Sequence, residues 1–121
     1  YDAVAELCYE VGVAMDMRYG HCGSGPGSTM EARIDRFRYD DSIEWRGGSD
    51  YTSEEWLALI QEEIDQSRPI AYFYPQHALV CDGWRVAGDE MQIHLNYGVS
   101  DSFNTWYTLD DIHGHGGDHR A

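Results

Sequence analysis

Apolar residues in the first part of the chain recur at a helical spacing and then give way to glycine. Over residues 1–12 they return every three or four positions, which predicts an amphipathic helix. These residues are Val4, Leu7, Cys8 and Val11. Gly12 is the predicted end of this helix. Weak alternation over residues 13–19 predicts a short extended piece, and the glycine-rich segment 20–28 is expected to form a loop without regular structure.

Two later segments carry the capping-box pattern, in which a hydroxyl residue is followed three positions later by Glu. The first, at residues 28–31, predicts a short helix that continues through Phe37. The second, at residues 52–55, predicts a longer helix that ends at Arg68-Pro69. The apolar stripe of this second helix comprises Trp56, Leu57, Ile60 and Ile64. The intervening residues 40–51 form a polar connection, and we read its acidic side chains as solvated surface.

After Pro69 the pattern changes from helical to extended. Segments rich in aromatic and β-branched residues predict strands at 70–74, 78–84, 91–97 and 105–109, with turns at 86–90 and 98–104. Helices therefore precede an antiparallel sheet, and the expected fold class is α+β. Residues 113–121 (HGHGGDHRA) are predicted to be a loose polar tail.

Composition and charge narrow the classes of partner. With 121 residues, 42% of them hydrophobic and 13% aromatic, the chain is expected to be one folded domain or part of one. Its formal net charge is −14, from 22 acidic and 8 basic residues. A protein that binds nucleic acid or an anionic membrane must supply positive charge, so neither is an expected partner of this acidic chain. Apolar runs stay well short of the roughly 20 residues that span a bilayer.

Two further features bear on processing and on thiol chemistry. The chain opens at Tyr1, directly in a helical pattern, which we interpret as a processed or truncated product. Its cysteines, Cys8, Cys22 and Cys81, form neither a CxxC pair nor a zinc-binding spacing. An odd number of cysteines leaves at least one free thiol.

The segment HALVCDGW at residues 77–84, followed by HLNYG at 94–98, points most directly to chemistry. It places a histidine on one strand and an asparagine near the end of the next, with an apolar run between them. A papain-type peptidase needs an imidazole as base and an amide that holds the tautomer and the ring angle of that imidazole. His77 and Asn96 are therefore the candidate catalytic residues.

Several segments, taken in order, resemble the catalytic domain of streptopain-like cysteine peptidases, which are bacterial papain-fold enzymes. The similar segments are VAELCYEVGVAMDMRYG at 4–20, GSGPGS at 23–28, Glu55-Trp56, Arg68-Pro69-Ile70, HALVCDGW at 77–84, IHLNYG at 93–98 and WYTL at 106–109. By this resemblance, residues 1–112 are the C-terminal part of such a domain, with a papain-like α+β fold.

The resemblance also implies roles for particular residues. His77 matches the catalytic histidine at the start of the family's H-A-x-V-x-D-G motif, and Asn96 matches the asparagine of its H-x-N-W-G-W motif. Ser24 and Gly25 match a loop that borders the substrate cleft. The implied activity is that of a secreted, extracellular endopeptidase acting on peptides or proteins, with neither a cofactor nor a metal.

The chain departs from the family pattern at several positions. The nucleophile of the family lies in a G-C-x-A-T-A motif, upstream of the segment that matches Tyr1, and this chain contains no such motif. Pro75-Gln76 replaces the glycine-rich lead into the histidine, and Tyr97 and Val99 replace the tryptophans of N-W-G-W. The loop at 100–104 also lacks the family's glycines.

These departures lead to two hypotheses. The first is that the nucleophilic cysteine lies on a missing upstream segment or on a companion chain, so that this chain alone is inactive. The second is a non-catalytic descendant that serves as a structural or binding subunit of an extracellular assembly.

Other candidate residues have simpler expected roles. Cys22 lies in the loop that borders the cleft and is the remaining candidate for a nucleophile within this chain. Cys8 is expected to be packed on a helix, and Cys81 lies about 13 Å along the strand from His77. His94 could compete as the active imidazole, although we expect it to be buried packing. The tail contains side chains that could bind a metal, although we read it as a disordered end: His113, His115, Asp118 and His119. The tryptophans Trp56, Trp84 and Trp106 are expected in the core.

Overall fold

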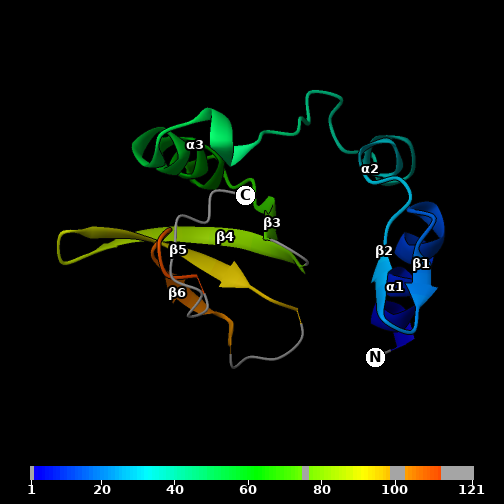
Figure 1. The fold of residues 1–121 in the computed structure, drawn as a ribbon. Coiled ribbons are helices and arrows are strands. Elements are labelled where there is room, and N and C mark those ends of the chain that lie inside the picture. The colour runs from blue at the N-terminus through cyan, green and yellow to red at the C-terminus, as the bar shows by residue number, and fades with distance from the viewer. Residues whose placement is uncertain (1, 75–76, 99–102, 113–121) are drawn as a thin grey trace. The chain divides into compact units, whose positions relative to one another are not determined.

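The computed structural model describes residues 2–74, 77–98 and 103–112. The chain divides into two compact units, residues 1–45 and residues 46–121, and each is described by itself. The first contains helix α1 (Asp2–Ala14), strands β1 (Arg18–Gly20) and β2 (Gly23–Gly25), and helix α2 (Met30–Phe37). The second contains the 3-10 turn η1 (Gly48–Asp50), helix α3 (Ser53–Asp65), and strands β3 (Ile70–Tyr74), β4 (His77–Ala87), β5 (Glu90–Asn96) and β6 (Thr105–Tyr107) (Figure 1). This arrangement confirms the predicted α+β class.

Helix α1 continues two residues past its predicted end. Gly12 lies inside the helix and is buried, and a Cβ atom there would lie 2.5 Å from the Tyr19 hydroxyl oxygen. Its lack of a side chain thus allows Tyr19 to approach the helix. The helix ends at Ala14 and is capped at Asp16, whose φ of 49° is left-handed, while the Met17 N–H donates to the Gly12 carbonyl at 2.9 Å. This is the bonding pattern of a Schellman cap.

The glycine-rich segment that was expected to be an irregular loop forms a small hairpin. Strands β1 and β2 pair antiparallel, with Tyr19 opposite Ser24 and Gly20 opposite Gly23, so only two residues connect them. A Cβ atom on Gly20 would lie 2.6 Å from the Gly23 carbonyl oxygen. The glycine-rich composition therefore permits a tight strand pair here, and the prediction of a loop without regular structure is wrong for Gly20 and for residues 23–25.

The two predicted capping boxes have different outcomes. At α3, the Thr52 Oγ1 accepts from the Glu55 backbone N–H at 3.2 Å, and the Glu55 carboxylate accepts from the Thr52 N–H at 2.8 Å. The pKa of the Glu55 carboxyl is lowered by these hydrogen bonds. At α2, the N-cap is Thr29, without a side-chain cap, and the Ser28 hydroxyl donates to the Glu31 carboxylate at 2.6 Å. The capping box predicted at 28–31 is therefore wrong.

The sheet of the second unit has the order β3-β4-β5-β6, with each pair antiparallel. Strand β4 is longer than predicted, since residues 85–87 still pair with residues 90–92 around the turn at Gly88 and Asp89. Gly88 has a φ of 68°, the left-handed conformation that glycine adopts most easily in two-residue hairpin turns. Strand β6 is shorter than predicted and ends at Tyr107.

The core of the second unit lies between α3 and one face of the sheet. Trp56 of α3 is buried there, and its indole N–H donates to the Tyr72 hydroxyl at 3.2 Å. The Trp84 indole N–H donates to Asp65 at the end of α3 at 2.9 Å. Trp84 and Trp106 are half-buried, so only Trp56 of the three tryptophans is a fully packed core residue. The buried cluster consists of Trp56, Ile60, Tyr72, Leu79, Cys81, Ile93, Leu95, Tyr97, Leu109 and Ile112.

The different roles of Thr52 and Ser28 predict different effects of the same substitution. Thr52→Ala removes an N-cap acceptor, a loss of about 1 kcal/mol, so the Glu55 amide should exchange its hydrogen about fivefold faster. Ser28→Ala is the matched control, because Ser28 carries the same sequence pattern without capping its helix. Its substitution should leave exchange at the Glu31 amide unchanged. Equal effects in hydrogen-exchange mass spectrometry would contradict the assignment of the two caps.

Candidate functional site

His77 begins β4 and lies beside the end of β5. Side chains alternate between the two faces of a strand, so His77 shares a face with Leu79 and Cys81, which are buried against the core. His77 itself is exposed, because it lies at the open end of that face. The candidate base is therefore an accessible imidazole at the edge of a packed core.

The His77 ring contacts Tyr97 in two ways. Its Nε2 lies 3.2 Å from the Tyr97 carbonyl oxygen, and its ring stacks on the Tyr97 ring with centroids 5.7 Å apart and planes at 25°. A carbonyl oxygen can only accept a hydrogen bond, so Nε2 must carry the proton in this contact. Nδ1 of the neutral ring then has the free lone pair that a general base requires.

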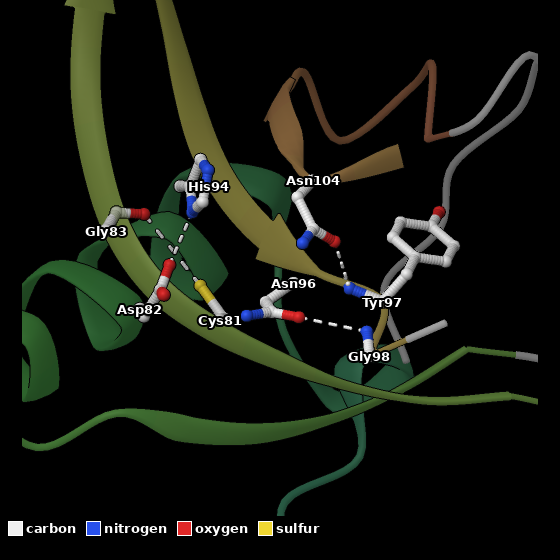
Figure 2. A network of polar contacts seen from close by, with 8 residues as sticks. All are labelled: Cys81, Asp82, Gly83, His94, Asn96, Tyr97, Gly98 and Asn104. Carbon is white, nitrogen blue, oxygen red and sulfur yellow. Dashed lines mark hydrogen bonds and ion pairs between the residues drawn. The ribbon is translucent and has the colours of Figure 1, made fainter. Parts of the chain in front are cut away.

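Asn96 uses its side chain differently from the predicted arrangement. Its Oδ1 accepts from the backbone N–H of Gly98 at 2.9 Å, which forms an Asx turn at the end of β5 (Figure 2). Asn96 pairs with Val80, and so it lies on the sheet face opposite that of His77. The structure thus brings His77 and Asn96 to the same end of the sheet but gives each a different hydrogen-bond partner.

Asn104 is a residue of this region that sequence reasoning missed. Its Oδ1 accepts from the Tyr97 N–H at 2.8 Å, which ties the start of the segment after β5 to the start of β6 (Figure 2). The Tyr97 ring is buried between Phe103 and Tyr107, at centroid distances of 5.7 and 6.1 Å. An asparagine in a polar loop carries no signal that would separate this role from an ordinary turn.

His94 forms a second histidine site on the other face of the sheet. Its Nδ1 lies 2.5 Å from the Asp82 carboxylate (Figure 2). Its ring packs on Trp106 with centroids 5.1 Å apart. The His94 side chain is 28% exposed, so it is half-buried and bound to Asp82 rather than fully buried as expected. Gly83 makes room for it, since a Cβ atom there would lie 3.3 Å from both the His94 Cβ and the Trp106 ring.

The three cysteines differ in exposure. Cys81 is completely buried, and burial raises the pKa of its thiol to about 12. Its neutral thiol contacts the Gly83 carbonyl at 3.9 Å and acts as packing. Cys8 and Cys22 are exposed, the former on α1 and the latter in the connection between β1 and β2. The expectation that Cys8 is packed is therefore wrong for this unit.

The remaining predicted positions belong to the first unit or lie outside the described residues. Ser24 and Gly25 are on β2, in the first unit, whereas His77 and Asn96 belong to the second. Pro75, Gln76, Val99 and the tail histidines lie outside the described residues. Within the described ranges, no three metal-binding side chains gather into a site. None of the helices described is long and apolar enough to cross a membrane.

The α+β fold and an exposed imidazole whose Nε2 donates to a backbone carbonyl fit a cysteine peptidase of the papain type. A sequence profile of the Peptidase C10 family matches residues 1–107, and the chain belongs to this family of cysteine peptidases. It is 34% identical to streptopain of Streptococcus pyogenes over 110 residues, which are 84% of this chain and 27% of streptopain. It is 29% identical to the thiol protease/hemagglutinin PrtT of Porphyromonas gingivalis over 102 residues, 79% of this chain and 11% of that protein.

The chain spans only about a quarter of the length of the streptopain sequences that it matches. Both relatives are bacterial, and the name of the second identifies it as a thiol protease. A peptidase-related role follows for this chain from its family.

The environments of the cysteines predict their reactivity. At pH 8 only about one Cys81 thiol in ten thousand is ionised, since its pKa is about 12, and the thiolate is the reactive form. Iodoacetamide should therefore modify Cys8 and Cys22 in the native protein and modify Cys81 only after unfolding in urea. Peptide mapping by mass spectrometry measures this. Labelling of native Cys81 at the rate of Cys22 would contradict the buried placement.

Proposed function

We propose that this chain supplies the histidine base and the orienting asparagine of a secreted cysteine endopeptidase. The observation that supports the proposal is the hydrogen bond from His77 Nε2 to the Tyr97 carbonyl. This bond fixes the tautomer and leaves Nδ1 as the proton acceptor. In a papain-type base, one ring nitrogen donates a hydrogen bond that holds the ring, and the other accepts the proton of the thiol.

In the assembled enzyme, Nδ1 of His77 accepts the proton of a cysteine thiol. The resulting thiolate attacks the carbonyl carbon of the substrate, and His77 then donates the proton to the leaving amine. A water molecule, deprotonated by the same imidazole, subsequently hydrolyses the acyl-enzyme. Throughout, the Nε2–H bond to Tyr97 holds the ring in place.

The nucleophile in this proposal comes from outside the 121 residues. Cys81 is buried, with a pKa of about 12, and it is held on the same strand as His77. Cys8 and Cys22 are exposed, and neither lies at the N-terminus of a helix, which would favour the thiolate. A missing upstream segment or a companion chain therefore carries the cysteine, and this chain alone does not hydrolyse peptides.

Substrate and location follow from the family resemblance. The substrates are peptides or proteins, and Ser24 and Gly25 border the cleft that holds them. The enzyme acts outside the cell. The net charge of −14 agrees with substrates other than nucleic acid.

A second function is supported by the position of Asn96. Its carboxamide oxygen serves the Gly98 N–H rather than an imidazole. An asparagine that serves as a turn residue, and does not orient a histidine, fits a non-catalytic descendant of a peptidase. Such a chain acts as a structural or binding subunit.

Active-site labelling distinguishes the two functions. We expect an epoxide-type thiol-protease probe, added to the native preparation, to modify a cysteine of a co-purifying segment. His77→Ala should abolish this labelling, because no base then generates the thiolate. Peptide mapping locates the modified residue.

His94→Ala is the matched control, since His94 lies on the same sheet but contacts Asp82 and Trp106 on the opposite face. Labelling should survive this substitution. Labelling of Cys22 would instead place the nucleophile within this chain. A folded preparation without any labelled cysteine would contradict the peptidase proposal and favour the structural subunit.

A further inference from the structure

One peptide group lies between the two candidate catalytic side chains. The carbonyl oxygen of Tyr97 lies 3.2 Å from His77 Nε2, and the N–H of Gly98 donates to Asn96 Oδ1 at 2.9 Å. These two atoms belong to the same planar amide. Asn96 and His77 are thus connected through the Tyr97–Gly98 peptide, with one hydrogen bond on each side of it.

The strand register explains why a backbone group occupies this position. Asn96 pairs with Val80, whereas His77 alternates with Leu79 on the other face of β4. The Asn96 side chain therefore points away from the face that carries the imidazole. The peptide that precedes Gly98 bonds to both residues, and the chain then continues through Gly98 with a left-handed φ of 70°.

Two further contacts hold this peptide in place. The Tyr97 N–H donates to Asn104 Oδ1 at 2.8 Å, so the backbone on the other side of Tyr97 is also bound (Figure 2). The Tyr97 ring is only 7% exposed and stacks on His77. Tyr97 therefore sets both the hydrogen-bond acceptor and the plane against which the imidazole lies.

We propose that Asn96 orients His77 through the Tyr97–Gly98 peptide rather than by direct contact, and that Tyr97, Gly98 and Asn104 are positioning residues. Asn96 fixes the Gly98 N–H, which fixes the tilt of the amide, and the carbonyl of the same amide keeps His77 in the Nε2–H tautomer. Hydrogen bonds at the two ends of one amide polarise each other, so the Asn96 contact also strengthens the carbonyl as acceptor. The catalytic meaning of this arrangement rests on the proposed function, whereas its geometry does not.

Nitrogen NMR of the whole chain labelled with ¹⁵N-histidine tests the arrangement without any activity. In the wild-type protein at a pH where the ring is neutral, His77 should be the Nε2–H tautomer. In Asn96→Ala the share of the Nε2–H tautomer should fall, because the Tyr97 carbonyl is still present but its amide has lost the contact that fixes and polarises it. The Gly98 amide should exchange its hydrogen about fivefold faster in this variant, because it has lost its acceptor.

Asn96→Ser sharpens the comparison. A serine hydroxyl can accept from the N–H two residues onward, as Asn does, but it is too short to reach an imidazole on the other face. Protection of the Gly98 amide and the wild-type tautomer of His77 should therefore both return in Asn96→Ser. The His94 ring is an internal reference, since its Nδ1 contact with Asp82 should give the same signal in every variant.

Direct orientation by Asn96 gives the opposite results. It requires His77 to show the same mixture of tautomers in Asn96→Ser as in Asn96→Ala, and Gly98 exchange to stay constant in both variants. An Nδ1–H tautomer of His77 in the wild-type protein would also overturn the inference, even if Asn96→Ala failed to fold. These outcomes are independent of the probe labelling, so a failure of the peptidase proposal and a failure of the peptide link are distinguishable.

Discussion

The pairing of β4 with β5 is the constraint on which the rest of the second unit depends. Leu79, Cys81, Ile93 and Leu95 are at most 3% exposed on the face that packs beneath α3. Fully burying an aliphatic side chain contributes about 1.5–3 kcal/mol, and a slip by one residue would turn this whole set to solvent. The register is therefore strongly determined. It places His77 beside Tyr97 and puts Asn96 on the other face, so the relation between the candidate catalytic residues is a consequence of core packing.

A bulge at Asp82 directs neighbouring side chains of β4 to partners on both faces of the sheet. The pairing shifts between Cys81 and Gly83, and the extra residue brings Trp84 onto the face of Ile93. The Trp84 indole then reaches Asp65 of α3, and the Asp82 carboxylate reaches His94. Bulges of this kind commonly redirect side chains near functional sites. Here one extra residue supplies both a tie between sheet and helix and a partner for the second histidine.

The two histidines of the sheet differ because their partners differ. His77 donates through Nε2 to a neutral carbonyl at an exposed strand end, whereas His94 directs Nδ1 to a carboxylate and packs on Trp106. An imidazole whose Nδ1 is engaged by a carboxylate can act as a base only through Nε2. The two rings therefore offer different nitrogens, and that of His77 is the more accessible because His94 is half-buried.

Sequence alone determined the α+β class, the four strands, the capping box of α3 and the segments HALVCDGW and HLNYG, because these depend on residue periodicity and on contacts within a few positions. It did not determine that residues 18–25 pair as a hairpin, that α1 is capped at a left-handed Asp16, or that Ser28 does not cap α2. Backbone conformation decides these features, and several residue types permit it. Tertiary structure alone decided the partners of His77 and Asn96. A sequence places a histidine and an asparagine on neighbouring strands, but which face each side chain takes, and which peptide lies between them, depends on the register and on the turn at Gly98.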